Sequence, residues 1–210
     1  EAAEYYWRES RGEMAHAGVR ASFFLGTMKR LATEYLPARK VMNRWLADAR
    51  RGVLQGDRNA LLMATEFAAL TTQLDARDEF LATAEQVEDK HVLAVLAGIA
   101  GEHLLVARRY DLLVASGLCE RKAVQSQIAM TRFTMGKVED ANRFARDRIL
   151  DQVAQAFEAL AGVGREEDAL AIAGLALEAY PDAECRSRLA AAATRAGKAT
   201  LAKRVRDGGE

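Results

Sequence analysis

The sequence predicts an all-α protein of tandem antiparallel helix hairpins that stack into an α-α superhelix. Half of the 210 residues are hydrophobic and only two are prolines, Pro37 and Pro181. Alanine and leucine dominate while β-branched residues are sparse, a mixture that favours helix. Apolar residues recur at spacings of three and four, as they do on one face of a helix. Similar turns separate these stretches along the chain.

The first predicted helix spans residues 7–35. Its apolar stripe comprises Trp7, Ser10, Met14, Ala17, Ala21, Phe24, Met28, Leu31 and Tyr35. Pro37 ends this helix and suits the first turn of the next one, because the N–H that proline lacks has no partner there. The second helix covers residues 38–54, and Gly52 and Gly56 mark its end.

Two polar turns divide the next residues into a third and a fourth helix. Asp57 is placed to cap a helix through residues 61–74, and Asp75 to cap a shorter helix that contains Phe80. A strongly apolar helix then begins at His91, and a short partner follows it. We assign residues 1–90 to N-terminal helical hairpins.

Residues 91–210 form the second part, continuous with the first, and contain a recurring turn. The step from Gly136 to Gly164 is 28 residues, and the step from Gly164 to Gly197 is 33. Each glycine separates two amphipathic stretches, so the hairpin is one of a series. Because the first step is short, either the link between Ala145 and Asp151 is nearly absent or the helices there run together.

Residues 94–207 resemble tetratricopeptide repeats, whose pattern is W-x2-L-G-x2-Y, then A-x3-F, then P. Pro181 matches the terminal proline of that pattern, and Ala169 and Ala176 match small residues of the second helix. In the same unit the first helix departs from the pattern, with Phe157 at a site that is small in the family. The neighbouring units match at Ile128, Ala129, Ala141, Leu189, Ala190 and Ala202.

The resemblance implies a noncatalytic scaffold or adaptor that binds a protein or peptide partner in a concave groove. In the family that groove is lined by the first helix of each unit. Transferred residue by residue, the candidate partner contacts are Ser126, Gln127, Met130, Phe133, Gln155, Glu158, Arg188 and Arg195. Interface energy concentrates in few side chains, so fewer than half of these contacts are expected to be hot spots. A homo-oligomer whose repeats cap one another is a third option.

A metal-dependent, di-iron-like helical-bundle enzyme is the alternative. Glu13 and His16, and likewise Glu88 and His91, have the Glu-x-x-His spacing that places a carboxylate and an imidazole on one helical face. The further carboxylates that such a site needs are nominated from Glu34, Glu66 and Glu102. His103 is expected to be a partly buried or surface residue. We therefore predict no cofactor, no resident metal and no catalytic residues for the preferred function.

Composition argues against two kinds of partner. Thirty basic and thirty acidic residues give no net charge, so we expect no nucleic acid partner. The longest uncharged apolar stretch, residues 91–101, is about half of a membrane span, so we expect no membrane partner and a cytoplasmic location. Cys119 and Cys185 lie in no metal-binding motif and are expected to be small buried side chains. Because the chain begins at Glu1, a missing upstream segment or signal peptide stays open.

Overall fold

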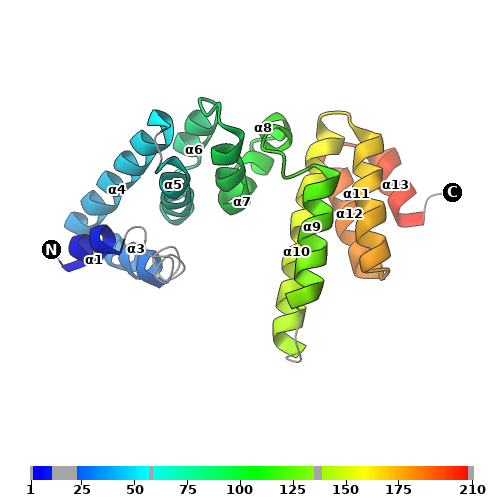
Figure 1. Cartoon of the computed structure of the whole chain (residues 1–210), viewed down its shortest axis with the longest axis horizontal. Helices are drawn as coiled ribbons and strands as arrows, with labels where there is room; N and C mark the ends of the chain where they lie inside the picture. The colour runs from blue at the N-terminus through cyan, green and yellow to red at the C-terminus, as the bar shows by residue number, and fades with distance from the viewer. Residues whose placement is uncertain (1, 11–22, 57–58, 135–138, 208–210) are drawn as a thin grey trace. The chain divides into compact units, whose positions relative to one another are not determined.

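A computed structural model describes residues 2–10, 23–56, 59–134 and 139–207, apart from the side chains of residues 139–141. These residues form twelve helices and contain no strand, which confirms the all-α prediction (Figure 1). The chain divides into two compact units, residues 1–103 and 104–210. The division lies inside one helix, whereas the sequence places its boundary near residue 90.

The first unit contains six helices among the described residues. They are α1 (Ala2–Glu9), α3 (Leu25–Glu34), α4 (Leu36–Gln55), α5 (Ala60–Leu74), α6 (Arg77–Ala84) and most of α7 (Lys90–Val106). Helix α4 packs against α3 and α5, and α5 packs against α6. The core of this unit is built from large side chains such as Met42, Phe67, Phe80 and Leu96, all fully buried.

Local signals in the sequence locate several helix ends of the first unit. Pro37 lies in the first turn of α4, as predicted, and Gly56 ends that helix in the left-handed region with a φ of 64°. The prediction that Asp75 caps α6 is wrong. Asp75 instead ends α5 at a φ of 53°, where its N–H donates to the carbonyl of Thr71, and Ala76 precedes α6.

The long stripe predicted for residues 7–35 is only partly realised. Trp7 and Met28 are buried, but Leu31 and Tyr35 are exposed because α3 ends at Glu34 and α4 begins in a new direction. Met14, Ala17 and Ala21 lie outside the described residues, as does the predicted cap Asp57. Helix α7 has a kink at Ala100, where φ is −124° and ψ is 26°.

The second unit contains the remaining helices. They are α8 (Tyr110–Ala115), α9 (Arg121–Thr134), α10 (Glu139–Gly162), α11 (Glu166–Ala179), α12 (Ala183–Arg195) and α13 (Ala199–Asp207). Helix α10 packs against α8, α9, α11 and α12, and α12 packs against α13. In Figure 1 one end of the α9 and α10 pair projects beyond α11 and α12. The core includes Ile149, Phe157, Leu160, Ile172 and Leu189.

The structure answers the question about the link near Ala145. Residues 139–162 form one continuous helix of 24 residues, so the two predicted helices run together. Gly164 and Gly197, with φ of 83° and 75°, form the predicted turns after α10 and α12. The predicted turn at Gly136 lies outside the described residues.

The small residues that are expected at helix crossings are mostly buried. Ala169, Ala176, Ala190 and Ala202 are at most 4% exposed. Ala129 is exposed, which differs from its predicted packing role. The side chain of Ala141 is not among those described. Phe157, at a site that is small in the tetratricopeptide pattern, is a fully buried ring.

Candidate functional site

Helix α9 has one buried face and one exposed face. Val124 and Ile128 are buried where α9 packs on α10 and α11. At 3.6 residues per turn, the opposite side carries a second row of residues. We call this row the outward face of α9; it consists of Lys122, Ser126, Ala129, Met130 and Phe133, all exposed.

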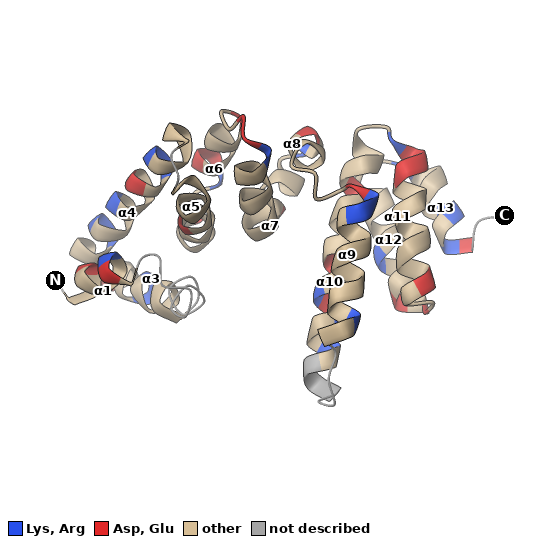
Figure 2. Cartoon of the chain, in the orientation of Figure 1, with Lys and Arg blue, Asp and Glu red and all other residues tan. Residues whose placement is uncertain are grey.

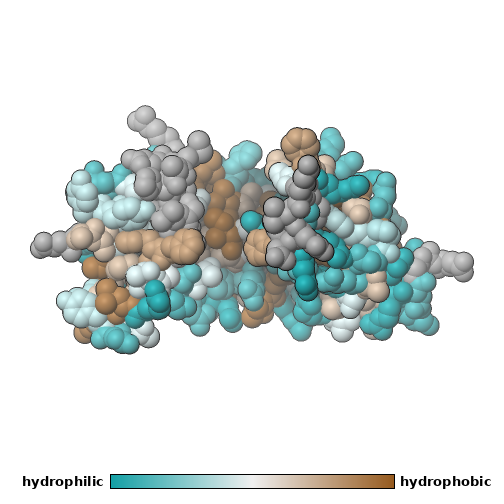
Figure 3. Space-filling model, turned by 90° about the horizontal axis from the view of Figure 1, so that it is seen from below, coloured by the Kyte–Doolittle hydropathy of each residue, from teal (hydrophilic) through white to brown (hydrophobic). Residues whose placement is uncertain are grey.

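Two large apolar side chains occupy one end of the outward face. Met130 is 69% exposed and Phe133 is 91% exposed. On the face of the second unit seen in Figure 3, small areas of hydrophobic surface lie among mostly hydrophilic residues. Single exposed apolar side chains are ordinary, but two of them one turn apart on the same helix form a small apolar surface that a partner can bury.

Sequence reasoning found the exposed residues of α9 but missed one on α10. Ser126, Met130 and Phe133 are exposed as a partner contact requires, and Gln127 is half-buried at the edge of the outward face. Phe144 is 71% exposed and is not among the predicted contacts. Phe144 is five residues before the buried Ile149 and nine before the buried Val153, so it lies on the opposite side of α10 from them. This spacing could have identified Phe144 as exposed from the sequence.

Glu158 and Arg195 are brought together within the second unit. Glu158 is 2% exposed, and Arg195 Nε donates a hydrogen bond of 2.7 Å to its Oε2. Tyr110 donates to Oε1 of the same carboxylate at 3.4 Å, and burial together with that carboxylate raises the pKa of Tyr110. The side chain of Glu158 is therefore a structural group of this unit and not the accessible partner contact that the sequence predicts.

Arg188 is also committed to contacts inside the unit. Its guanidinium donates to Asp147 Oδ1 at 2.8 Å, Asp151 Oδ1 at 2.7 Å and Glu184 Oε1 at 2.6 Å. Burial alone would lower the pKa of Arg188, but the hydrogen bond to Glu184 and the nearby carboxylates outweigh burial and raise it. These bonds join α10 to α12, so Arg188 holds two helices together.

A second arginine reinforces this junction. Arg146 donates to Asp182 Oδ2 at 2.5 Å, and Asp182 accepts from the N–H of Cys185 at 3.0 Å and so caps α12. Gln155, the last of the predicted contacts, is half-buried on α10. Of the predicted residues, Ser126, Met130 and Phe133 are thus exposed on α9, Glu158, Arg188 and Arg195 form ion pairs between α10 and α12, and Gln127 and Gln155 are half-buried.

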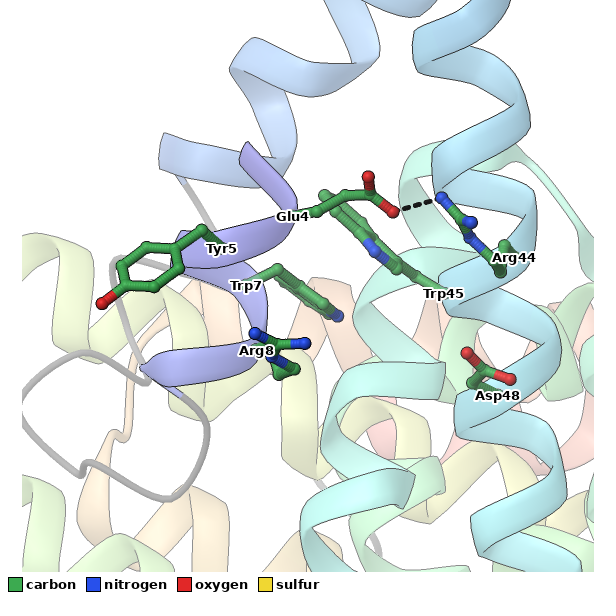
Figure 4. Close-up of a pocket in the computed structure, with 7 residues that line it drawn as sticks. All are labelled: Glu4, Tyr5, Trp7, Arg8, Arg44, Trp45 and Asp48. Atoms are coloured by element: carbon green, nitrogen blue, oxygen red, sulfur yellow. Dashed lines mark hydrogen bonds and ion pairs between the residues drawn. The ribbon is translucent and has the colours of Figure 1, made fainter. Parts of the chain in front are cut away.

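The first unit contains a separate pocket of about 430 Å³ between α1 and α4 (Figure 4). Trp7 and Trp45 stack there with ring centroids 4.7 Å apart, and Glu4 pairs with Arg44 across the pocket. The other charged side chains of the lining are paired too, Arg8 with Glu9 and Asp48 with Arg51. Stacked rings and paired charges are typical of a packed helix junction.

The residues nominated for the di-iron alternative do not assemble among the described residues. Nowhere in the described part of the chain do three His, Cys, Asp or Glu side chains lie close enough to hold a metal ion. Glu34, Glu88, His91 and Glu102 are exposed, whereas Glu66 is buried on α5. Glu13 and His16 lie outside the described residues.

Three further residues behave as the sequence predicts. Cys119 and Cys185 are free, buried thiols, and burial raises the pKa of Cys119 to about 12 and that of Cys185 to about 11. His103 is half-buried beside Phe80, with ring centroids 5.2 Å apart. Burial and the charge of Arg77 lower the pKa of His103.

The helices of the described ranges include none with the length and hydrophobicity that a bilayer crossing requires. Comparison of the chain with models of known families, with curated proteins and with solved structures finds no match.

Proposed function

We propose that this chain is a noncatalytic helical-repeat scaffold that binds a protein or peptide partner. The exposure of Met130 and Phe133, one turn apart on α9, carries this proposal. Burying two such side chains in an interface would contribute several kcal/mol, at about 1.5–3 kcal/mol for each side chain. Two of the eight contacts that the resemblance implies are thus large apolar groups that already face solvent.

The packing of the second unit supports the same proposal. Helices α10 and α11 form one antiparallel pair, α12 and α13 form another, and α10 packs on α12 (Figure 1). We infer that these pairs stack in the manner of a tetratricopeptide-like superhelix, in which each hairpin depends on its neighbours for stability. The ion pairs of Arg188 and Arg146 stabilise the junction and leave α9 as the helix that presents side chains to a partner.

Site-specific photo-crosslinking in the native cells tests this proposal. A photoreactive phenylalanine analogue replaces Met130 or Phe133 in separate variants. The control variant carries the analogue at Leu61 of α5, which is 50% exposed and lies in the other unit. We expect a discrete crosslinked species at positions 130 and 133 that is absent at position 61.

The partner identified from that species is then purified and its binding measured. The Met130→Ser and Phe133→Ser variants should bind at least about tenfold more weakly, a loss of about 1.4 kcal/mol or more. Their melting temperatures should match that of the wild type because both side chains are exposed. The proposal fails if positions 130 and 133 give no crosslink, or give the same products as position 61.

A further inference from the structure

We propose that the pocket between α1 and α4 binds a small zwitterion, namely an α-amino acid with an apolar side chain. The pocket lies in the first unit, whereas the partner surface proposed on α9 lies in the second, so this site is an additional one. Three features of the pocket point to such a ligand: its volume, the indole rings that line it, and the opposite charges on its two walls.

The pocket has the size and the apolar lining of a small-molecule site. Its volume of about 430 Å³ falls within the range of about 300–1,000 Å³ that is usual for such sites. Trp7 and Trp45 line it, with ring centroids 4.7 Å apart, and both are at most 5% exposed. Because packing holds these indoles in place, they offer a fixed apolar surface to the side chain of a ligand.

Charged side chains occupy the two walls of the pocket at matching positions. Glu4 and Arg8 lie about one turn apart on α1, and they line the same pocket. Arg44 and Asp48 have the same spacing on α4. Figure 2 shows that α1 and α4 both carry acidic and basic residues. Each helix therefore presents one carboxylate and one guanidinium to the pocket, so a bound molecule meets no net charge.

An ion pair joins the two walls at one end of the pocket but not at the other. Glu4 pairs with Arg44 and so links α1 to α4 (Figure 4). At the other end Arg8 and Asp48 come from opposite walls, and in the described part of the chain each of them pairs with a neighbour on its own helix. A guanidinium and a carboxylate thus flank this end of the pocket without bonding to each other.

A zwitterion carries the two charges that would join Arg8 to Asp48. The carboxylate of an amino acid accepts hydrogen bonds from the guanidinium of Arg8, and its ammonium group donates to the carboxylate of Asp48. The present ion pairs of these two residues are exposed to solvent and contribute little, so a ligand can replace them easily. An apolar side chain on the same ligand then lies against the indole rings, where its burial adds affinity.

Ligands with a single kind of charge fit this pocket less well. A cation beside Asp48 would also lie near the guanidinium of Arg8, and an anion beside Arg8 would also lie near the carboxylate of Asp48, so each would meet a like charge. Glu4 and Arg44 do not change this balance because they neutralise each other. An uncharged ligand would leave the charges of Arg8 and Asp48 without a counterpart on the ligand.

Tryptophan fluorescence tests the proposal directly. Trp7 and Trp45 are the two tryptophans of the chain, so emission excited selectively from tryptophan reports on this pocket. The full chain is titrated with L-leucine, with L-leucinamide, which lacks the carboxylate, and with N-acetyl-L-leucine, which lacks the ammonium group. We expect a saturable change in emission with L-leucine at a Kd below about 1 mM, and binding at least about tenfold weaker with each of the other two compounds.

Two variants locate the binding site. Arg8→Gln and Asp48→Asn should each weaken the binding of L-leucine at least about tenfold, and their melting temperatures should match that of the wild type because both side chains are exposed. The matched controls are Arg39→Gln on α4 and Asp78→Asn on α6, which remove the same charges from exposed positions of the first unit outside the pocket. Both controls should bind L-leucine as the wild type does. Equilibrium dialysis with radiolabelled L-leucine repeats each comparison without depending on the emission of the variants.

The possible results separate the ligand from its location. The zwitterion is wrong if L-leucine does not bind, or if L-leucinamide or N-acetyl-L-leucine binds as tightly, because a single charge is then sufficient. The location is wrong if Arg8→Gln and Asp48→Asn bind L-leucine as tightly as the wild type does. None of these results affects crosslinking at positions 130 and 133, so the pocket and the surface of α9 are tested separately.

Discussion

Replacing Gly162 by alanine should destabilise the second unit by about 2 kcal/mol. A Cβ at this position would overlap Cδ2 of Tyr110 and would lie 2.5 Å from Cε2 and 2.7 Å from Cγ of the same ring. Ordinary carbon contacts are about 3.5–4.0 Å, so the ring would have to move by about 1 Å or more. Tyr110 is only 8% exposed and its hydroxyl donates to the buried Glu158, so the ring has little room to move.

The magnitude follows from three terms. Overpacking of a buried site costs about 1–3 kcal/mol, and weakening the hydrogen bond between Tyr110 and Glu158 costs about 1 kcal/mol more. The better helix propensity of alanine returns at most about 1 kcal/mol. The sum is a loss of about 2 kcal/mol in the free energy of unfolding.

Gly174 provides the matched control. It lies in α11 of the same unit and is exposed, and a Cβ added there would meet no other atom within 4 Å. Gly174→Ala should therefore stabilise the unit by about 0.5–1 kcal/mol through helix propensity alone. Urea unfolding followed by circular dichroism, together with hydrogen exchange of the α10 amides, measures both variants. If Gly162→Ala is as stable as Gly174→Ala, the close packing of Tyr110 on α10 is wrong.

Three other perturbations have definite expected outcomes. Ala169→Leu should lower the free energy of unfolding by about 1–3 kcal/mol, since Ala169 is fully buried on α11; an unchanged melting temperature would contradict that packing. Burial raises the pKa of Cys119 and Cys185, so these thiols ionise at a lower pH in the unfolded chain than in the folded one, and the free energy of unfolding should fall as the pH rises above about 9. Urea unfolding at pH 8 and 10 measures this fall, which should be smaller in a Cys119→Ala, Cys185→Ala variant. The pKa of His103 is lowered in the folded chain, so the imidazole of the unfolded chain binds a proton at a higher pH, and the free energy of unfolding should fall as the pH drops below about 6.5. If a His103→Gln variant loses as much free energy of unfolding between pH 7 and 5 as the wild type does, this reasoning is wrong.

Helix content and many helix ends could be predicted because local residues determine them. Pro37 fixes the start of α4, and Gly164 and Gly197 permit the left-handed turns after α10 and α12. Asp75 shows the limit of local reasoning. Aspartate is favoured both before a helix and in left-handed turns, and only the geometry of α5 and α6 selects the second role.

The residues of the candidate site could be predicted where the exposure of a side chain depends on its own helix alone. They could not be predicted where exposure depends on packing between several helices. Met130 and Phe133 lie off the buried face of α9, a property of their own helix. Sequence reasoning places Glu158 on the surface because glutamate is rarely buried unless it is paired. Its partners Arg195 and Tyr110 come from α12 and α8, far away in the sequence, so no local pattern identifies them.

Because α10 is one continuous helix, the orientation of its N-terminal end relative to its C-terminal end depends on the number of residues between them. No glycine or proline interrupts residues 139–161, so the two ends of α10 belong to one continuous helix. Each residue of a helix advances the chain by about 100° around the axis and 1.5 Å along it. Adding or deleting a single residue near Arg148 would therefore turn the two halves of α10 by about 100° relative to one another, so that Phe144 would face a different side of the helix from the one it now faces.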